Sequence, residues 1–260
     1  MTISPNRLRA IIINLESAVD RRRLMNAQLD WPGMPAHEFL AAIDGRRLDP
    51  EQRRAIYDEA AAIRHDRPLT AAEIGCAASH LAAYRHILEQ NLPAALILED
   101  DALLGHQFPQ VLARILATLE PTHPQVILLS HVARYSAWRS RRLDRLHRLF
   151  RPYSAFGAHA YVITQAGARA MLATLQPIHT VADDWRHVMR SGRIDLQAVV
   201  PYPVGTIPAA RDSQIGDDRF DLPRKRSALY RWLHKYLWMK LLFQIVAKPL
   251  LRLKKQESSW

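Results

Sequence analysis

Apolar and polar residues alternate in short blocks along the first two hundred positions of the chain. Compact runs rich in Ile, Leu and Val predict buried strands at residues 8–15, 37–43, 94–98, 125–130, 158–163 and 196–200. Apolar residues at helical spacing predict helices at residues 18–30, 51–63, 70–90, 107–119 and 165–175. Strands that alternate with helices are typical of an α/β fold, so we expect a mostly parallel central sheet flanked by helices. The Arg-rich segment 131–151 shows no clear period and is expected at the surface.

The strand predicted at 94–98 leads directly into three carboxylates, Glu99, Asp100 and Asp101. Ligands of α/β proteins bind beyond the carboxyl ends of the strands, which is where these acids fall. Side chains alternate along an extended chain, so Glu99 and Asp101 should share one side and Asp100 should face the other. Three adjacent carboxylates repel one another, and a hard divalent cation such as Mg²⁺ or Mn²⁺ would relieve them. The alternative is a solvated acidic turn.

The longest predicted helix begins with a recognisable signal. Thr70 is followed three residues later by Glu73, which is the pattern of a capping box and explains Glu73 structurally. The small residues 75–79 would let a backbone or a ligand approach closely. Cys76 could act as a nucleophile with His80 one turn away. A small buried thiol in helix packing is the more common reading of such a cysteine.

The passage from the first strand to the first helix, residues 14–23, is a usual place for a nucleotide in this class of fold. Its arginines could grip a phosphate, although neither GxGxxG nor GxxxxGK[ST] occurs in the chain. For Arg22 and Arg23 an exposed basic helix face is an equal alternative.

A second acidic pair, Asp183 and Asp184, stands beside Trp185. An aspartate there could serve as a general base, with the Trp ring stacking on a sugar, and the alternative is a helix start. His159, His179 and His187 show no zinc-ligand spacing with a cysteine, so we predict no zinc site.

Taken in order, five segments resemble glycosyltransferase family 25, the bacterial lipopolysaccharide and lipooligosaccharide sugar transferases. They are I-I-N-L-x-x-x-x-x-R at Ile12–Arg21, A-x-D-G at Ala42–Gly45, E-I-G-C-A-x-S-H at Glu73–His80, N-L-P-x-A-L-I-L-E-D-D at Asn91–Asp101, and the G-x-x-A-Y segment at Gly157–Ile163. The combination of the third and fourth segments at this spacing is specific.

The resemblance implies a GT-A-like nucleotide-sugar domain at residues 1–222. It implies inverting transfer of a hexose, with galactose expected, from a UDP-sugar to a saccharide or lipid-linked saccharide in cell-surface glycan synthesis. Mn²⁺ or Mg²⁺ would be held by Asp101 and Glu99 of a DxD-like element, and would neutralise the departing diphosphate. Asp184, with Asp183 second, would be the catalytic base. The implied donor-binding residues are Asn14, Leu15, Arg21, Asp44, Ser79, His80, Glu99 and Asp100.

Net charge is concentrated at one end of the chain. Residues 224–260 hold ten of the 36 Lys and Arg residues and one of the 25 acids, so they carry +9 of the net charge of +11. Apolar and aromatic residues recur there near helical spacing, which predicts a basic amphipathic helical tail at 223–260. Such a tail suits an anionic membrane surface. The alternative is a helix packed on the body.

The remaining 223 residues are close to neutral, and this argues against nucleic acid as a partner. The apolar runs near the start and in the tail are shorter than a signal peptide or a membrane span requires. The single Cys76 fits a reducing compartment. We therefore expect a cytoplasmic protein at the inner face of the cytoplasmic membrane. Two other hypotheses remain: a catalytically degenerate scaffold, suggested by Glu99 in place of Asp, and a nucleic-acid-binding protein that uses the tail.

Overall fold

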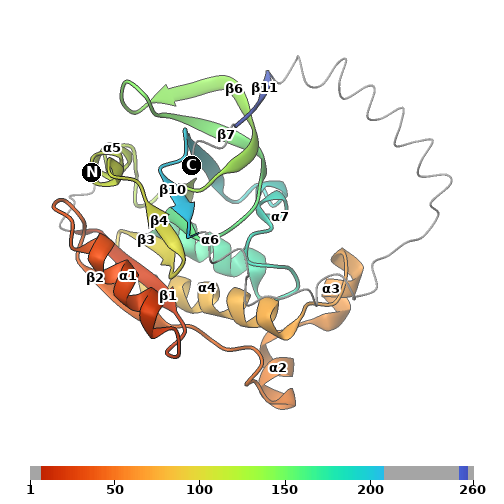
Figure 1. Cartoon of the computed structure of the whole chain (residues 1–260). Coiled ribbons are helices and arrows are strands. Elements are labelled where there is room, and N and C mark those ends of the chain that lie inside the picture. Colours follow the sequence, from red (N-terminus) through yellow and green to blue (C-terminus); the bar gives the residue numbers. More distant parts are fainter. Residues whose placement is uncertain (1–6, 208–251, 257–260) are drawn as a thin grey trace.

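The computed structural model describes residues 7–207 and 252–256 (Figure 1). Within them a nine-stranded sheet has the order β11-β6-β7-β9-β5-β8-β3-β1-β2. Its strands are β1 (Arg9–Asn14), β2 (His37–Ala41), β3 (Ala94–Glu99), β5 (Gln125–Leu128), β6 (Val132–Arg142), β7 (Arg148–Ala155), β8 (Ala160–Thr164), β9 (Asp195–Val200) and β11 (Leu253–Lys255). A separate antiparallel pair joins β4 (Ala102–Leu104) to β10 (Val204–Thr206).

The α/β class is confirmed, but the large sheet is mixed rather than mostly parallel. Parallel pairs join β1 to β2, β1 to β3 and β5 to β9. The other five pairs are antiparallel, because β8 runs against both β3 and β5, and because β6, β7 and β11 add antiparallel strands at one edge. The predicted surface segment 131–151 therefore belongs to a hairpin that extends the sheet.

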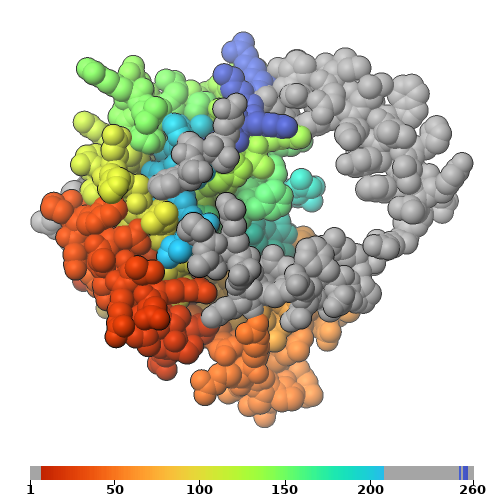
Figure 2. All heavy atoms as spheres, viewed as in Figure 1, coloured from red at the N-terminus to blue at the C-terminus, as the bar shows by residue number. Residues whose placement is uncertain are grey.

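Helices cover both faces of the sheet. They are α1 (Val19–Leu29), α2 (Pro50–Ile56), α3 (Glu59–His65), α4 (Ala71–Glu89), α5 (Phe108–Leu116), α6 (Gln165–Leu175) and α7 (Trp185–Arg190). In Figure 2 the surface around α2, in orange, protrudes at the bottom of the molecule. Among the described residues, no helix combines the length and the apolar character needed to cross a membrane.

Strand alternation divides the buried residues into two cores. In β1, Ile11 and Ile13 join the core that holds α4 and α6, while Ala10 and Ile12 join the core of α1 and α5. The neighbouring strand β3 follows the same rule, with Ile97 on the α4 side and Leu98 on the α1 side. Polar residues that continue β3 are therefore directed alternately toward α4 and α1.

Two expectations about helices had different outcomes. Thr70 caps α4, and the reciprocal bonds between Thr70 and Glu73 confirm the capping box. The single helix predicted at 51–63 is wrong, because it divides into α2 and α3 at Tyr57 and Asp58. The Asp58 carboxylate accepts from Ala61 N at 2.8 Å and starts the second helix, while the Tyr57 hydroxyl accepts from Leu69 N at 2.9 Å.

The predicted helical tail lies largely outside the described residues. Of residues 223–260, only 252–256 are described, and Leu253–Lys255 form β11, antiparallel to β6. The amphipathic helix predicted before them stays a prediction.

Candidate functional site

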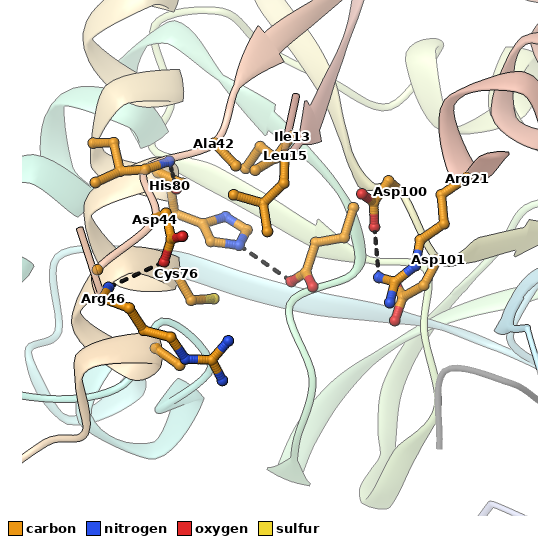
Figure 3. Close-up of a pocket in the computed structure, with 15 residues that line it drawn as sticks. Ile13, Leu15, Arg21, Ala42, Asp44, Arg46, Cys76, His80, Asp100 and Asp101 are labelled. Atoms are coloured by element: carbon orange, nitrogen blue, oxygen red, sulfur yellow. Dashed lines mark hydrogen bonds and ion pairs between the residues drawn. The ribbon is translucent and has the colours of Figure 1, made fainter. Parts of the chain in front are cut away.

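The carboxyl ends of β1 and β3 meet beside the first half of α4 and form a pocket (Figure 3). The two strands run parallel with Ile13 opposite Glu99, so the residues that follow each strand emerge side by side. Seven of the eight predicted donor-binding residues line this pocket together with Asp101: Leu15, Arg21, Asp44, Ser79, His80, Glu99 and Asp100. The fold thus gathers segments that are far apart in the sequence.

Two glycines bring the loop after β2 onto the start of α4. A Cβ at Gly45 would overlap the backbone of Ala71, and a Cβ at Gly75 would overlap the backbone of Gly45 and Ile43. Ser79 reinforces the contact, because its hydroxyl accepts from Ile43 N at 2.8 Å and donates to Gly75 O at 2.7 Å. This packing fixes Asp44 at the rim of the pocket and assigns Ser79 a structural role.

Asp100 is held by two partners from the β1–α1 segment. Asn14 donates to its Oδ2 at 2.8 Å, and Arg21 donates to its Oδ1 at 3.0 Å. Asp100 therefore faces α1, as strand alternation predicts, and both of its oxygens are occupied (Figure 3). Asn14 supports the pocket from behind Asp100.

Glu99 faces α4 and ends a buried chain of hydrogen bonds. His80 Nε2 lies 3.2 Å from Glu99 Oε1, and His80 Nδ1 lies 2.8 Å from the hydroxyl of Tyr161. That hydroxyl lies 2.8 Å from the hydroxyl of Tyr84. Burial raises the pKa of Glu99, but the hydrogen bond from His80 and nearby positive groups outweigh it, so the pKa is below its ordinary value. Glu99 is therefore an oriented carboxylate.

Asp101 is the third of the consecutive carboxylates that line the pocket. Its Oδ1 is buried and has no hydrogen-bond partner among the described residues. Burial, together with the charges of Glu99 and Asp100, raises the pKa of Asp101 to about 7. A buried polar atom without a partner is costly, and a cation or a ligand donor would satisfy it.

The acids at 183 and 184 lie at a different pocket. It is lined by residues of α3, β7 and the 179–186 segment, Asp183 and Asp184 among them. Asp184 caps α7 by accepting from His187 N at 3.0 Å, and its Oδ2 contacts Thr180 and His65. Burial raises its pKa, but these hydrogen bonds outweigh it and hold the pKa below its ordinary value. Such a carboxylate binds a proton poorly.

Asp183 accepts fewer hydrogen bonds than Asp184. Its Oδ2 accepts from Gly157 N at 2.8 Å, and no partner is present for Oδ1 among the described residues. His159 lies within electrostatic reach of both Asp183 and Glu99, and its buried Nε2 lacks a hydrogen-bond partner in the described part of the chain. His159 therefore lies near both carboxylates.

A family model described as glycosyltransferase family 25 (LPS biosynthesis protein) matches residues 8–186. The chain belongs to glycosyltransferase family 25. The matched span includes every residue of the pocket at the ends of β1 and β3. The resemblance inferred from the sequence motifs is thereby confirmed.

Several named proteins share this similarity. Human procollagen galactosyltransferase 2 is 31% identical over 113 residues, which cover 42% of this chain and 18% of that protein. Putative glycosyltransferase R655 of Acanthamoeba polyphaga mimivirus is 27% identical over 169 residues, with 62% and 51% covered. A glycosyltransferase 25 family member of Aedes aegypti is 35% identical over 109 residues, with 40% and 18% covered. This chain therefore spans less than two thirds of the length of each relative.

The residues of the pocket fit a divalent cation. Asp101 offers a buried oxygen that has no hydrogen-bond partner within residues 7–207 and 252–256, and Glu99 offers a second carboxylate nearby. Carboxylate oxygens are the ligands that Mg²⁺ and Mn²⁺ prefer. A second set overlaps it, because ligand atoms of Cys76, His80 and Glu99 lie within 4.8 Å of one another. Sulfur and nitrogen ligands favour a softer ion, so the two sets would select different metals.

Two residues that contribute to the pockets of this family 25 chain were not predicted from the sequence. Tyr161 belongs to the G-x-x-A-Y segment, but its hydrogen bond to His80 joins two residues that are 81 positions apart. Arg67 was not singled out, although it makes two bonds of 2.9 and 2.7 Å to the Glu73 carboxylate and lines the second pocket. A tyrosine within a buried apolar strand needs a hydrogen-bond partner for its hydroxyl, and this was the sequence signal that could have identified Tyr161.

Proposed function

We propose that this family 25 chain is a metal-dependent inverting glycosyltransferase with a GT-A-like donor domain. It transfers a hexose, galactose in our proposal, from a UDP-sugar to a saccharide acceptor in lipopolysaccharide or other cell-surface glycan synthesis. The observation that carries the proposal is the buried Asp101 oxygen, which lacks a partner among the described residues and lies beside Glu99 at the end of β3. The family match and the galactosyltransferase names of several relatives support the reaction class.

Asp101 and Glu99 would hold the Mn²⁺ or Mg²⁺. When bound, such an ion neutralises negative charge on a departing diphosphate. His80 keeps Glu99 oriented through a hydrogen bond and is itself held by Tyr161. These buried partners reduce the reorganisation needed when the donor binds.

Arg21 is the cation of the pocket best placed for a diphosphate. Its NH1 is held by Asp100, and the guanidinium has further N–H groups to offer a ligand. Leu15 and Ala42 supply apolar contact, and Asp44 at the rim would accept hydrogen bonds from hydroxyl groups of the nucleotide ribose or the sugar. Recognition of the donor thus combines the Arg21 guanidinium, oriented carboxylates and the apolar contacts of Leu15 and Ala42.

An inverting transfer also needs a base for the acceptor hydroxyl. Of the pair singled out in the sequence, we favour Asp183 over Asp184. Asp184 already accepts hydrogen bonds at both oxygens, whereas Asp183 keeps Oδ1 for an acceptor.

A lipid-linked saccharide acceptor would lie at a membrane surface. The basic residues within 224–260 support binding of the protein to such a surface. We propose that the protein acts in the cytoplasm, attached peripherally to the inner face of the cytoplasmic membrane through this segment. Its composition, with ten basic residues and one acid, is the supporting observation.

The proposal is tested by measuring UDP release from UDP-hexoses with Mn²⁺, Mg²⁺ or EDTA. We expect UDP-galactose turnover that needs the metal and falls about 100-fold or more in Asp101→Asn. Glu89→Gln, an exposed carboxylate on the same helix as His80, serves as the matched control. Turnover unchanged in Asp101→Asn would overturn the metal assignment. Tight UDP binding without turnover on any acceptor would instead favour the degenerate scaffold.

A further inference from the structure

A third pocket, which we call the arginine groove, lies between the β6–β7 hairpin and the segment that runs from α7 into β9. Its cavity volume is about 860 Å³. Ligand pockets of proteins are typically about 300–1,000 Å³, so the groove is large enough for an extended ligand. Six arginines line it: Arg139, Arg141, Arg151, Arg186, Arg190 and Arg193.

The protein itself neutralises little of this positive charge. Asp195 is the one carboxylate among the described lining residues, and its Oδ2 is already engaged with His123 Nε2 at 3.5 Å and Gln197 Nε2 at 2.8 Å. In the described part of the chain, Arg193 donates to Ala173 O at 3.0 Å, and none of the six arginines forms an ion pair. The chain before residue 224 is close to neutral, so this surplus of positive charge is local. A bound anion would relieve the repulsion among these guanidinium groups.

Exposed aromatic rings lie in the same groove. Trp138 is 57% exposed and Tyr153 is 38% exposed, and both line the cavity. The apolar face of a sugar ring packs on such rings, whose surface is large and rigid. Guanidinium groups bind carboxylates and phosphates through two parallel hydrogen bonds. The combination favours a saccharide that carries negative charge.

The arginine groove adjoins the second pocket. Arg186 lines both cavities, and along β7 residues 151–153 line the groove while residues 154–156 line the second pocket. The second pocket contains Asp183 and Asp184, whose charges would repel the phosphates of a nucleic acid that continued into it. A saccharide would instead present hydroxyl groups to these carboxylates. The position of the groove therefore favours a saccharide over a nucleic acid.

We propose that the arginine groove binds an anionic saccharide, one that carries carboxylate or phosphate groups, as the acceptor of the transferase. The acceptor role rests on the proposed function, because it places the end of the saccharide at Asp183. The arginines bind the charged groups, while Trp138 and Tyr153 pack on the sugar rings. The donor and the acceptor would then use separate surfaces of the protein.

The test is a calorimetric titration of the full chain, without donor or metal, with probes of different chemistry. Tetragalacturonate carries a carboxylate on every sugar, maltotetraose is neutral, and single-stranded DNA of the same net charge represents a nucleic acid. We expect tetragalacturonate to bind at least about tenfold more tightly than either of the others. The groove variant, in which Arg139, Arg141 and Arg151 are changed to Gln, should bind it about tenfold or more weakly. Trp138→Ala should weaken binding by about two- to tenfold.

Two matched variants separate the groove from other positive charge. One changes the same number of exposed arginines on α1, α5 and α6, namely Arg23, Arg114 and Arg169, to Gln. The other changes lysines of the basic C-terminal segment, namely Lys225, Lys235, Lys240 and Lys248, to Gln. Both should bind tetragalacturonate like the wild type. Melting temperatures show whether each variant is folded.

No binding of tetragalacturonate by the wild type, equally tight binding of maltotetraose, or unchanged binding in the folded groove variant would overturn the proposal. Tighter binding of the DNA would overturn it in favour of a nucleic-acid site. Loss of binding to anionic vesicles, but not to tetragalacturonate, in the groove variant would overturn it in favour of a membrane contact. Because these titrations contain neither donor nor metal, their outcome is independent of the Asp101→Asn measurement, and the groove and the reaction can fail separately.

Discussion

The carboxyl group of Asp101 should make the protein less stable as the pH rises. Its pKa in the folded protein is about 7, raised by burial and by the neighbouring acids, while an unfolded Asp has a pKa of about 3.9. The folded state therefore loses stability between about pH 4 and pH 7, because the folded state then holds a proton that the unfolded state has released. Without metal, Asp101→Asn should raise the melting temperature at pH 8 and leave it nearly unchanged at pH 4.

Thermal melts in EDTA at pH 4, 6 and 8 measure this difference, with Glu89→Gln as the exposed control. Adding Mn²⁺ at pH 8 should raise the melting temperature of the wild type more than that of Asp101→Asn. A difference between wild type and Asp101→Asn that does not grow with pH would contradict the role assigned to burial of this carboxylate.

The hydroxyl of Tyr161 should matter more than that of Tyr84. Tyr161→Phe leaves both His80 Nδ1 and the Tyr84 hydroxyl buried without a partner, at a cost of about 1–3 kcal/mol each. Tyr84→Phe keeps the bond between Tyr161 and His80 and is the matched control. Urea denaturation should show the larger loss of stability in Tyr161→Phe, together with a lower kcat for UDP release because His80, which orients Glu99, loses the hydrogen bond that holds its own ring. Equal effects of the two changes would contradict the hydrogen-bond chain.

At the scale of elements, the close contact between Gly45 and Gly75 should outweigh helix propensity. Gly75 lies within α4, where Ala would ordinarily stabilise a helix by about 1 kcal/mol. A Cβ at Gly75 would overlap the backbone of the 43–45 loop, and backbone cannot move aside cheaply. Gly75→Ala should therefore destabilise the protein by about 1–3 kcal/mol or more.

Urea denaturation measures this effect, and Ala82→Gly in the same helix reports the propensity contribution alone. Because the 43–45 loop carries Asp44, donor affinity in Gly75→Ala should fall as well. A more stable Gly75→Ala variant would show that the loop yields easily.

Elements that are encoded by residues adjacent in the sequence could be predicted. Elements whose form depends on neighbouring strands could not. The apolar run of β3 and the capping box of α4 are encoded in adjacent residues, so both were found. The hairpin of β6 and β7 was missed because its outer part is exposed on both faces and carries arginines without a period of two. The direction of β8 was missed because neighbouring strands, not its own residues, determine it.

The same distinction holds for the site. Strand alternation predicted that Glu99 and Asp100 face opposite sides, and the structure has Glu99 toward α4 and Asp100 toward α1. The family motifs included Arg21 and Asp44, which line the same pocket. The contact between His65 and Asp184 could not be predicted, since the two residues are 119 positions apart and no spacing rule links them. Asp184 was chosen as a base from its neighbours in sequence, whereas its hydrogen bonds come from the fold.

At the scale of the whole molecule, charge asymmetry predicts where the protein binds. Residues 224–260 carry +9, so the full chain should bind vesicles that contain anionic lipid and release them at high salt. Each lysine near such a surface contributes about 1 kcal/mol. Changing Lys225, Lys235, Lys240 and Lys248 to Gln should therefore weaken vesicle binding by up to about a thousandfold. Sedimentation with anionic and with neutral vesicles measures the effect.

The matched control removes the same charge from the body of the protein, by changing the exposed residues Arg23, Arg114, Arg145 and Arg169 to Gln. If net charge alone drew the protein to the membrane, this variant would lose as much binding as the lysine variant. If the C-terminal segment docks as proposed, it should bind almost like the wild type, because its charges are spread over α1, α5, α6 and the β6–β7 turn. Equal binding of the wild type to neutral and anionic vesicles would remove the basis for a membrane-attached transferase while leaving the donor pocket intact.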